Sequence, residues 1–349
     1  MRIAMVSTPF LAVPPHKYGG TELVIHELVE GLVQRGHDVV LFATGDSTTS
    51  AELRFAYPEA QWPPSSAAEM YHVSSAMDQI ADGDFDLVHT HSAMTLGFGR
   101  LLPDLPMVYT LHHHRVDDLS QFYRHFPKTH YIAISNRQKE LEVPLPNCDV
   151  IYHGLDPSRF ECSDTADSYV TFIGRLSEEK GPHHAIDAAR MAGLPIYIGG
   201  EVHPPDVEYS KRELATRLHQ PHVNSLGGIG VAEKVPLLKK SRALLTPICW
   251  EEPFGLILTE AMLCGCPVVA FPRGSAPELI ENGVTGYLVN SPAEMAEIIR
   301  PGGPLDTFDR LRCRTRAVTR FSRDRMVADH VRLYNEIMAE RSSAEALVA

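Results

Sequence analysis

The chain has 349 residues, of which 44% are hydrophobic and 22% are charged, and its formal net charge at pH 7 is −12. This length predicts two globular domains with sizeable cores, and the acidic balance argues against a general nucleic-acid-binding protein. No apolar run approaches the roughly 18–20 residues of a membrane span, and the six cysteines form neither a disulfide framework nor a zinc-ligand spacing. The start, MRIAMVSTPF, lacks the apolar stretch of a signal peptide. We therefore expect a cytoplasmic protein without integral membrane association, whereas peripheral contact stays open.

The first half of the chain alternates short apolar runs with helical segments. Residues 2–7 predict a strand, and residues 21–36 predict a helix with apolar side chains on one face. Thr21 is the expected N-cap of this helix and Gly36 its C-terminal stop. Further buried strands are expected at 37–44, 86–92, 107–113, 130–135 and 148–154.

The same alternation starts again in the second half. Strands are expected at 169–176, 195–200, 222–228, 243–248 and 267–271. Helices are expected at 183–193, 232–241 and 255–264. Near the end of the chain, seven arginines crowd one stretch, which indicates either a solvated surface or a site for an acidic partner or an anionic membrane: Arg310, Arg312, Arg314, Arg316, Arg320, Arg323 and Arg325.

This alternation predicts an α/β protein with two Rossmann-like, doubly wound domains in succession. We expect the first domain to span residues 1–157 and the second to span residues 158–328, with the polar segment Asp156–Tyr169 at the junction. Because ligands bind at the carboxyl ends of parallel strands, the ligand site is expected in a cleft between two such domains facing each other.

A dehydrogenase-type dinucleotide site is not expected. Its GxGxxG fingerprint follows a strand directly and opens a helix. The first strand–helix loop instead reads STPFLAVPPHKYGG, with one Gly-Gly pair at its end, and the second half contains no such fingerprint. Gly19 and Gly20 nevertheless precede a helix N-terminus, whose free N–H groups and dipole favour an anion. A glycine turn that merely feeds a capped helix is the alternative.

The segment GRLSEEKG has the features of a phosphate site. It follows an expected strand and places Arg175 and Lys180 at the carboxyl end of that strand. Arginine can grip a phosphate in bidentate fashion. The alternative is a surface ion pair with Glu178 or Glu179.

The segment CWEEPFGLILTEAMLCGCPVV holds two carboxylates in apolar surroundings. Glu252 lies in the loop before a helix that is apolar nearly all round, and Glu260 lies inside that helix. A buried carboxylate needs hydrogen-bond donors, and the vicinal hydroxyl groups of a sugar or ribose supply them. The alternative is a glutamate paired with a buried arginine or with main-chain N–H groups.

Together these segments resemble the retaining glycosyltransferases of family 4, which have the two-Rossmann-domain architecture called GT-B. EPFGLILTE matches the E-x7-E motif of that family in full, and EAMLCGCPVVA continues it. GRLSEEKG, which begins at Gly174, resembles the phosphate-binding segment, and YGGTELVIHELVEGLVQRGHDV resembles the amino-terminal Gly-Gly loop and helix. RFSRDRMVADHVRLYNEIM looks like the last helix of the family, so residues 329–349 are expected to cross back to the first domain.

The resemblance implies a role for each matched residue. Glu260 would hold the ribose hydroxyls of the nucleotide, and Glu252 would face hydroxyls of the donor sugar. Main-chain N–H groups around Phe254, Gly255 and Leu256 would complete the sugar and phosphate contacts.

The resemblance also implies which cations and glycines contact the diphosphate. Arg175 and Lys180 would bind it and stabilise the charge that develops on the leaving group. Gly20, together with Gly19, would let the first domain approach it closely, and Gly174 would contribute to the nucleotide site.

The family also has a histidine at the end of a first-domain strand, near the donor sugar. His112 is the best match, although His113 and His114 follow directly. Consecutive side chains of an extended strand point to opposite faces, which argues against a three-histidine metal site. We therefore expect no metal site.

The expected function is metal-independent, retaining transfer of a hexose from a nucleotide-diphosphate sugar to a hydroxyl acceptor. A UDP-sugar is the favoured donor, a GDP-sugar is possible, and no separate cofactor is expected. Loops such as Pro9–Tyr18 and Arg115–Phe126 would bind the acceptor. The alternatives are a nucleotide-sugar epimerase on the same fold and a non-catalytic nucleotide-sugar-binding protein.

Overall fold

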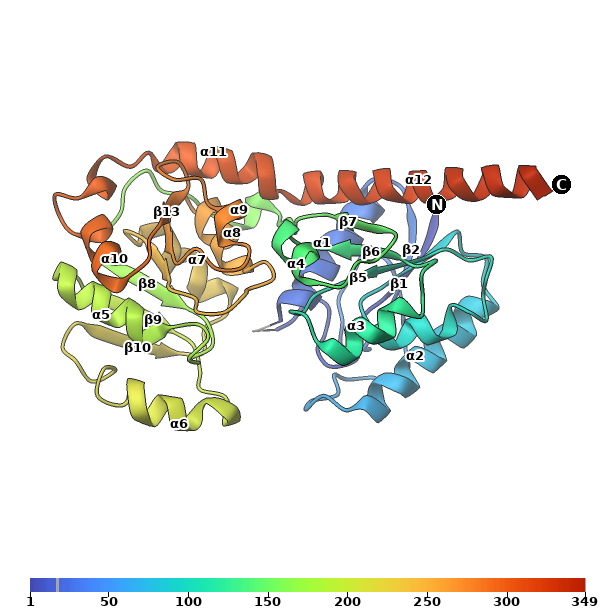
Figure 1. The fold of residues 1–349 in the computed structure, drawn as a ribbon, viewed down its shortest axis with the longest axis horizontal. Coiled ribbons are helices and arrows are strands. Elements are labelled where there is room, and N and C mark those ends of the chain that lie inside the picture. The colour runs from blue at the N-terminus through green and yellow to red at the C-terminus, as the bar shows by residue number, and fades with distance from the viewer. Residues whose placement is uncertain (17–18, 349) are drawn as a thin grey trace. The chain divides into compact units, whose positions relative to one another are not determined.

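A computed structural model describes residues 1–16 and 19–348, and the chain divides into two compact units (Figure 1). Unit 1 contains Met1–Leu155 together with the segment that starts at Arg323, and unit 2 contains Asp156–Ser322. Each unit is built on one parallel β-sheet with helices packed against it. The predicted α/β class with two successive doubly wound sheets is therefore confirmed.

The sheet of unit 1 has seven strands in the order β3-β2-β1-β4-β5-β6-β7. Its strands are β1 (Arg2–Val6), β2 (Asp38–Ala43), β3 (Glu52–Phe55), β4 (Leu87–Thr90), β5 (Met107–Thr110), β6 (His130–Ala133) and β7 (Cys148–Val150). Its helices are α1 (Gly20–Gln34), α2 (Ser66–Ala81), α3 (Asp117–Arg124), α4 (Asn136–Leu141) and α12 (Arg323–Val348), with a 3-10 turn at Ala93–Phe98. The four central strands β1, β4, β5 and β6 are buried almost throughout, as their unbroken apolar runs require.

The sheet of unit 2 has six strands in the order β10-β9-β8-β11-β12-β13. Its strands are β8 (Val170–Ile173), β9 (Ile196–Gly199), β10 (Val223–Gly227), β11 (Leu244–Thr246), β12 (Val268–Ala270) and β13 (Gly286–Leu288). Its helices are α5 (Pro182–Ala192), α6 (Val207–Tyr209), α7 (Val231–Lys240), α8 (Leu256–Leu263), α9 (Ala276–Leu279), α10 (Pro292–Ile299) and α11 (Arg310–Phe321). A π-helical turn at Ser210–Leu214 continues α6, and 3-10 turns occur at Pro157–Arg159, Pro204–Asp206 and Pro304–Thr307.

Three details of the sequence prediction need correction. The N-cap of α1 is Gly19 rather than Thr21, because the helix already begins at Gly20 and no side chain caps it. The strands β3 and β13 were not predicted. β3 is an edge strand with exposed or half-exposed side chains, and β13 has only three residues, so neither produces an apolar run.

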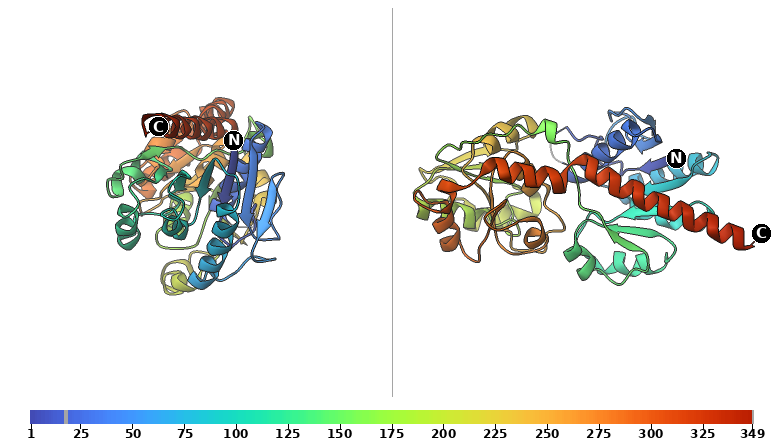
Figure 2. Two further views of the ribbon diagram at one scale, coloured as in Figure 1. Left: turned by 90° about the vertical axis from the view of Figure 1, so that its right-hand side faces the viewer. Right: turned by 90° about the horizontal axis from the view of Figure 1, so that it is seen from above.

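The last helix, α12, packs on α1 of unit 1 (Figures 1 and 2), as the resemblance implied. A Cβ atom on Gly31 of α1 would lie 2.4 Å from Cγ2 of Val327, so the glycine lets the two helices touch. The guanidinium of Arg35 donates to the carbonyl of Asp324 at 2.8 Å.

The arginine-rich stretch falls on α11 and the start of α12, and it serves the fold. The buried guanidinium of Arg310 donates to three main-chain carbonyls at 2.8–2.9 Å. Arg314 and Arg320 likewise donate to carbonyls, and Arg316 forms an ion pair with Glu281 at 2.7 Å. Arg325 also donates to the carbonyl of His153 at 2.8 Å, so main-chain carbonyls accept hydrogen bonds from four of the seven arginines.

Candidate functional site

The topology of unit 2 brings together two segments that are about seventy residues apart in sequence. The strand order reverses between β8 and β11, and such a switch point is where open α/β sheets bind ligands, at the carboxyl ends of the strands. Residues 174–181 follow β8, and residues 247–255 follow β11. The N–H of Cys249 donates to the carbonyl of Glu179 at 2.7 Å, so the two predicted loops are in contact.

Lys180 and Glu252 form an ion pair across these two loops, and both side chains are largely buried. The indole Nε1 of Trp250 donates to Oε2 of Glu252 at 2.7 Å, and the ammonium of Lys180 lies 5.3 Å from the centroid of the Trp250 ring. The ammonium is thus held by a carboxylate and by an aromatic face. The sequence prediction did not include Trp250, although it lies inside the segment that contains Glu252.

Arg175 points to two carboxylates in this structure. Its NH2 lies 2.5 Å from Oε2 of Glu179, and its Nε lies 3.4 Å from Oδ2 of Asp206. The ion pair with Glu179 is the alternative considered from the sequence. Asp206 lies on the segment after β9 and was not foreseen. With about a third of its side chain exposed, Arg175 remains accessible to an anion.

The loop before α8 has a conformation that requires glycine. Gly255 is the N-cap of α8 with φ = 77°, and a Cβ atom there would lie 2.9 Å from Cδ1 of Leu258. The buried ring of Phe254 packs edge-on against Phe321, with ring centroids 6.2 Å apart. The first two N–H groups of α8, those of Leu256 and Ile257, have no intrahelical acceptor and are therefore available to an anion or a sugar oxygen, whereas the N–H of Leu258 donates to the carbonyl of Gly255 at 3.0 Å.

A second glycine, not foreseen from the sequence, holds the backbone of Glu252. Gly274 has φ = 55°, and a Cβ atom there would lie 2.3 Å from both the N and the O of Glu252. Ser275 donates its N–H to the carbonyl of Glu252 at 3.0 Å and its hydroxyl to the carbonyl of Phe254 at 2.6 Å. The loop after β12 therefore fixes the loop that carries Glu252.

Glu260 lies on α8 with 2% of its surface exposed. Its two carboxylate oxygens each lie 2.7 Å from the ammonium of Lys234 on α7. A buried cationic partner was the alternative considered from the sequence, and the partner is a lysine rather than an arginine.

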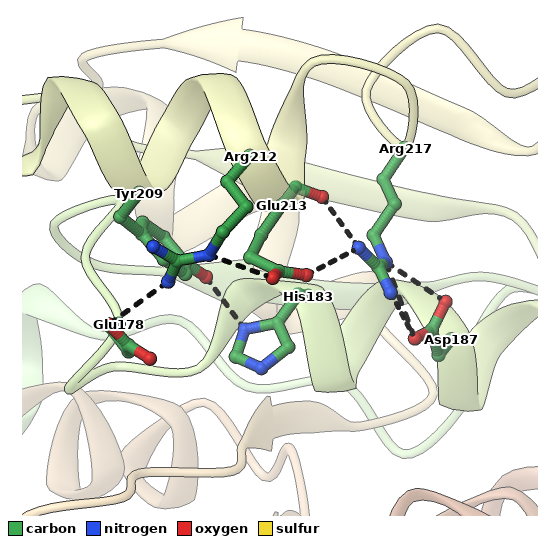
Figure 3. Close-up of polar contacts among 7 residues, drawn as sticks. All are labelled: Glu178, His183, Asp187, Tyr209, Arg212, Glu213 and Arg217. Carbon is green, nitrogen blue, oxygen red and sulfur yellow. Dashed lines mark hydrogen bonds and ion pairs between the residues drawn. The ribbon is translucent and has the colours of Figure 1, made fainter.

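A polar network fixes the segment after β9 beside these loops (Figure 3). Its members are Glu178, His183, Asp187, Tyr209, Arg212, Glu213 and Arg217. Arg217 bridges Asp187 of α5 and Glu213 at 3.1 and 3.0 Å, and Arg212 lies 3.3 Å from Glu178 of the GRLSEEKG loop. Burial lowers the pKa of His183 to about 4, so the neutral ring can accept the hydroxyl of Tyr209 at 2.6 Å. The network anchors the surroundings of Arg175.

In unit 1, Gly19 and Gly20 start α1 where main chain and side chains crowd together. A Cβ atom on Gly19 would lie 2.8 Å from Cβ of Pro15 and 2.9 Å from Oε2 of Glu22. Burial raises the pKa of Glu22, which favours its neutral form beside this helix N-terminus. Of the expected acceptor loop Pro9–Tyr18, Lys17 and Tyr18 lie outside the described residues.

The structure separates the three consecutive histidines. Nε2 of His112 lies 2.7 Å from Nδ1 of His91, and the His112 ring stacks on His153 with centroids 5.4 Å apart. Burial lowers the pKa of His112 to about 3. Nε2 of His113 instead lies 2.7 Å from the hydroxyl of Tyr123, and His114 is exposed. Over residues 1–16 and 19–348, no three His, Cys, Asp or Glu side chains are grouped so as to hold a metal ion.

No helix in the described part of the chain is both long and apolar enough to span a membrane. The unforeseen residues of the site are Trp250, Asp206, Lys234, Gly274 and His91. Only Trp250 could have been found from the sequence, because it lies beside the E-x7-E segment. The other four meet their partners only through the tertiary fold.

Solved structures share this architecture. Sucrose-phosphate synthase from Thermosynechococcus elongatus superposes with a TM-score of 0.80 at 20% identity, over 97% of this chain and 100% of that chain. Anabaena HepE, in a complex with UDP and glucose, superposes with a TM-score of 0.74 at 21% identity, over 96% and 99% of the two chains. The fold of this chain is therefore GT-B.

Sequence relatives and family models agree with that class. The chain is 25% identical over 341 residues to an uncharacterized glycosyltransferase of Methanocaldococcus jannaschii, covering 83% of this chain and 85% of the relative. It is 25% identical over 342 residues to the alpha-maltose-1-phosphate synthase of Mycolicibacterium smegmatis, covering 85% and 86%. The model Glycosyltransferase Family 4 matches residues 18–159, and the model Glycosyl transferases group 1 matches residues 159–300. The chain belongs to this family of glycosyltransferases, which take the sugar from a nucleotide sugar.

Proposed function

We propose that this enzyme transfers a hexose from a nucleoside-diphosphate hexose to a hydroxyl acceptor with retention of configuration and without a metal ion. The observation that carries the proposal is the contact between the loops after β8 and β11 at the switch point, with Lys180 against Glu252. A UDP-sugar is the favoured donor, and the Anabaena HepE complex with UDP and glucose supports that choice.

Different residues of unit 2 bind different parts of the donor. Arg175 and Lys180 hold the diphosphate and stabilise the charge that develops on it as it leaves. Glu260 accepts hydrogen bonds from the ribose, and Glu252 accepts them from the sugar. Main-chain N–H groups from Phe254 to Leu256 complete the contacts.

The same proposal gives three residues of unit 1 a role toward the donor. Gly19 and Gly20 would allow close approach of main chain to the diphosphate, and His112 would face the donor sugar. With its pKa lowered to about 3, the imidazole of His112 is neutral at pH 7 and acts as a hydrogen-bond partner rather than as a charge. The acceptor binds to loops of unit 1.

The pairing of Glu252 supports a mechanism without a covalent intermediate. A double displacement needs a carboxylate nucleophile under the anomeric carbon. Glu252 already shares its negative charge with the ammonium of Lys180 and the indole N–H of Trp250, which makes it a poor nucleophile. The acceptor oxygen therefore bonds to the anomeric carbon on the face that the diphosphate leaves, and its proton passes to the departing phosphate oxygen. Catalysis rests on positioning and on stabilisation of the leaving group.

A thermal-shift screen against UDP, GDP, ADP and their hexose conjugates tests the donor class, because a ligand that binds the folded state raises the melting temperature. The proposal expects a shift with one nucleoside diphosphate and with its sugar conjugate. The absence of any shift, together with the absence of calorimetric binding, would contradict it.

The substitution Glu260→Gln is expected to weaken nucleoside-diphosphate binding by about 10-fold or more, because a charged acceptor of the ribose hydroxyls becomes a neutral amide. Isothermal titration calorimetry with UDP measures the change. Glu297 is an exposed glutamate of α10 that pairs with Arg300, the residue after that helix, so Glu297→Gln is the matched control and should bind like the wild type. An unaltered affinity in Glu260→Gln would count against ribose recognition by this residue.

Removal of divalent ions with EDTA is expected to leave turnover unchanged, because the charge of the leaving diphosphate is met by Arg175 and Lys180. Initial rates of nucleoside-diphosphate release before and after chelation and gel filtration provide the measurement. Loss of activity that Mg²⁺ or Mn²⁺ restores would show that the leaving group needs a metal ion.

A further inference from the structure

The helices α7 and α8 of unit 2 meet through Lys234 and Glu260. The ammonium of Lys234 lies 2.7 Å from each carboxylate oxygen of Glu260, so it sits on the bisector of the carboxylate. The side chains are 15% and 3% exposed, respectively. No other side chain in the described part of the chain donates a hydrogen bond to this carboxylate.

The surroundings of Glu260 offer the carboxylate nothing else. Leu258, Ala261 and Met262 on α8 are apolar and buried almost completely, and the hydroxyl of Thr259 donates to the carbonyl of Leu256 at 2.8 Å instead. A carboxylate in such a place is strongly destabilising unless a cation compensates it. Lys234 is therefore the residue that makes a charged side chain tolerable at position 260.

Lys234 is itself held in place. It lies in the first turn of α7, where its N–H donates to the carbonyl of Gly230 at 3.0 Å. The carboxylate of Glu233 accepts the N–H of Gly230 at 3.0 Å and closes that turn. Val235 and Leu238 are buried and fix the helix on the unit. The ammonium thus approaches Glu260 from a rigid helix rather than from a loop.

The geometry leaves the carboxylate half available. A carboxylate has about four lone-pair positions, two on each oxygen. The ammonium of Lys234, equidistant from both oxygens, occupies one position on each. One position on each oxygen is left, and because these two positions point away from each other, the ribose reaches one of them with one hydroxyl group.

We propose that Lys234 is a positioning residue of the ribose subsite: it holds the Glu260 carboxylate in one orientation, so that one oxygen offers its free lone pair to the 2′-hydroxyl of the ribose. The inference rests on the proposed role of Glu260 in nucleotide binding. The opposite role, in which Lys234 competes with the ribose for the carboxylate, predicts the opposite sign when the lysine is removed.

The test compares UDP with 2′-deoxy-UDP, which differ by one hydroxyl donor, and repeats the comparison with GDP and 2′-deoxy-GDP. Calorimetric affinities are measured for the wild type, Lys234→Met, Lys234→Arg, Glu260→Gln and the double variant Lys234→Met/Glu260→Gln. Lys239→Met, on the same helix with its ammonium 2.6 Å from exposed Glu161, is the matched control. Thermal unfolding and circular dichroism verify that each variant is folded.

The wild type and Lys239→Met are expected to prefer the ribonucleotide by about 10-fold or more, the scale of one hydrogen bond to a charged group. Lys234→Met and Glu260→Gln should lose most of this preference while their affinity for the deoxynucleotide changes little. Lys234→Arg should restore part of it, because the positive charge is kept. The double variant should behave like Glu260→Gln alone, since Lys234 acts only through Glu260.

A full ribose preference in folded Lys234→Met would overturn the inference, and so would tighter UDP binding in that variant, because it would mark the lysine as a competitor. Both results leave the proposed transfer intact. A wild type that binds no nucleoside diphosphate would overturn the proposed function together with the inference. A wild type that binds UDP and 2′-deoxy-UDP equally would overturn the ribose subsite alone.

Discussion

Replacement of Lys180 by alanine is expected to lower kcat by at least about 100-fold, the usual scale for loss of a key electrostatic group, while the protein stays folded. The same is expected of Arg175→Ala. Both cations lie on the loop that follows β8 at the switch point, where a leaving diphosphate develops negative charge. Steady-state rates of nucleoside-diphosphate release provide the measurement.

The ion pairs of these residues call for specific controls. Lys180→Ala also leaves Glu252 without its lysine, so a loss of activity could arise from that loop instead of from the phosphate. Glu252→Gln, which breaks the same ion pair and keeps the lysine, separates the two effects: if Lys180 serves the diphosphate, Lys180→Ala should retain less activity than Glu252→Gln. Lys211→Ala, an exposed lysine of unit 2 paired with Glu208, should be neutral. Unchanged activity in both Lys180→Ala and Arg175→Ala would refute the phosphate assignment.

Unit 1 is expected to lose stability steeply as the pH falls below about 6.5, the ordinary pKa of histidine. The cause is a cluster of five histidines, of which His112 is partly buried and the other four are buried: His89, His91, His112, His153 and His330. Burial is the main reason that their pKa values are lowered, and repulsion within the cluster adds to it. The pKa falls to about 3 for His112 and to about 4 for His330.

The sign of the effect follows from proton linkage. Well above pH 6.5 these rings are neutral in both the folded and the unfolded chain, so they do not make stability depend on pH. Below that value these histidines bind protons in the unfolded chain but stay neutral in the folded unit. Each of them therefore lowers the free energy of unfolding by about 1.4 kcal/mol per pH unit. The contribution of His330 levels off below about pH 4, where the folded ring is protonated too.

Urea unfolding of the full chain between pH 7.5 and 4.5 measures this dependence. His330→Leu, which removes one ring that stacks on His89, should flatten the pH profile, whereas His219→Leu, at an exposed position of unit 2, should leave it unchanged. Arg325 and Asp329 act on His330 in opposite directions, so they do not reverse the effect. A free energy of unfolding that stays constant from pH 6.5 to 4.5 would be incompatible with neutral buried histidines.

The sequence predicted most of the fold because the central strands are buried on both faces and therefore read as unbroken apolar runs. β3 was not predicted because an exposed edge strand needs no apolar pattern. The cap of α1 was misassigned because a threonine next to two glycines looks like an N-cap, whereas the glycines themselves form the turn. Local patterns thus identified most strands and helices. They failed at the start of α1, where the conformation of the glycine backbone rather than a capping side chain sets the first residue of the helix.

The two halves of the candidate site were equally visible in sequence, because GRLSEEKG and EPFGLILTE are contiguous segments. Their partners were not. Lys234 meets Glu260 from a helix 26 positions earlier in the chain, and Gly274 supports Glu252 from the loop after β12. Such pairs arise from packing of separate elements, and nothing in the local composition of AEKVPLLKKS marks one lysine as the counter-ion of a buried glutamate.

The most direct test of the central claim follows the fate of the donor sugar with and without acceptors. UDP-hexoses and GDP-hexoses are incubated with the enzyme and a panel of sugar and lipid hydroxyl acceptors, and nucleoside-diphosphate release is measured together with the NMR spectrum of the product. Transfer predicts release that depends on an acceptor and a glycoside with the anomeric configuration of the donor. Isomerisation of the donor without an acceptor, an inverted glycoside, or tight binding with no turnover on any donor that binds would contradict it.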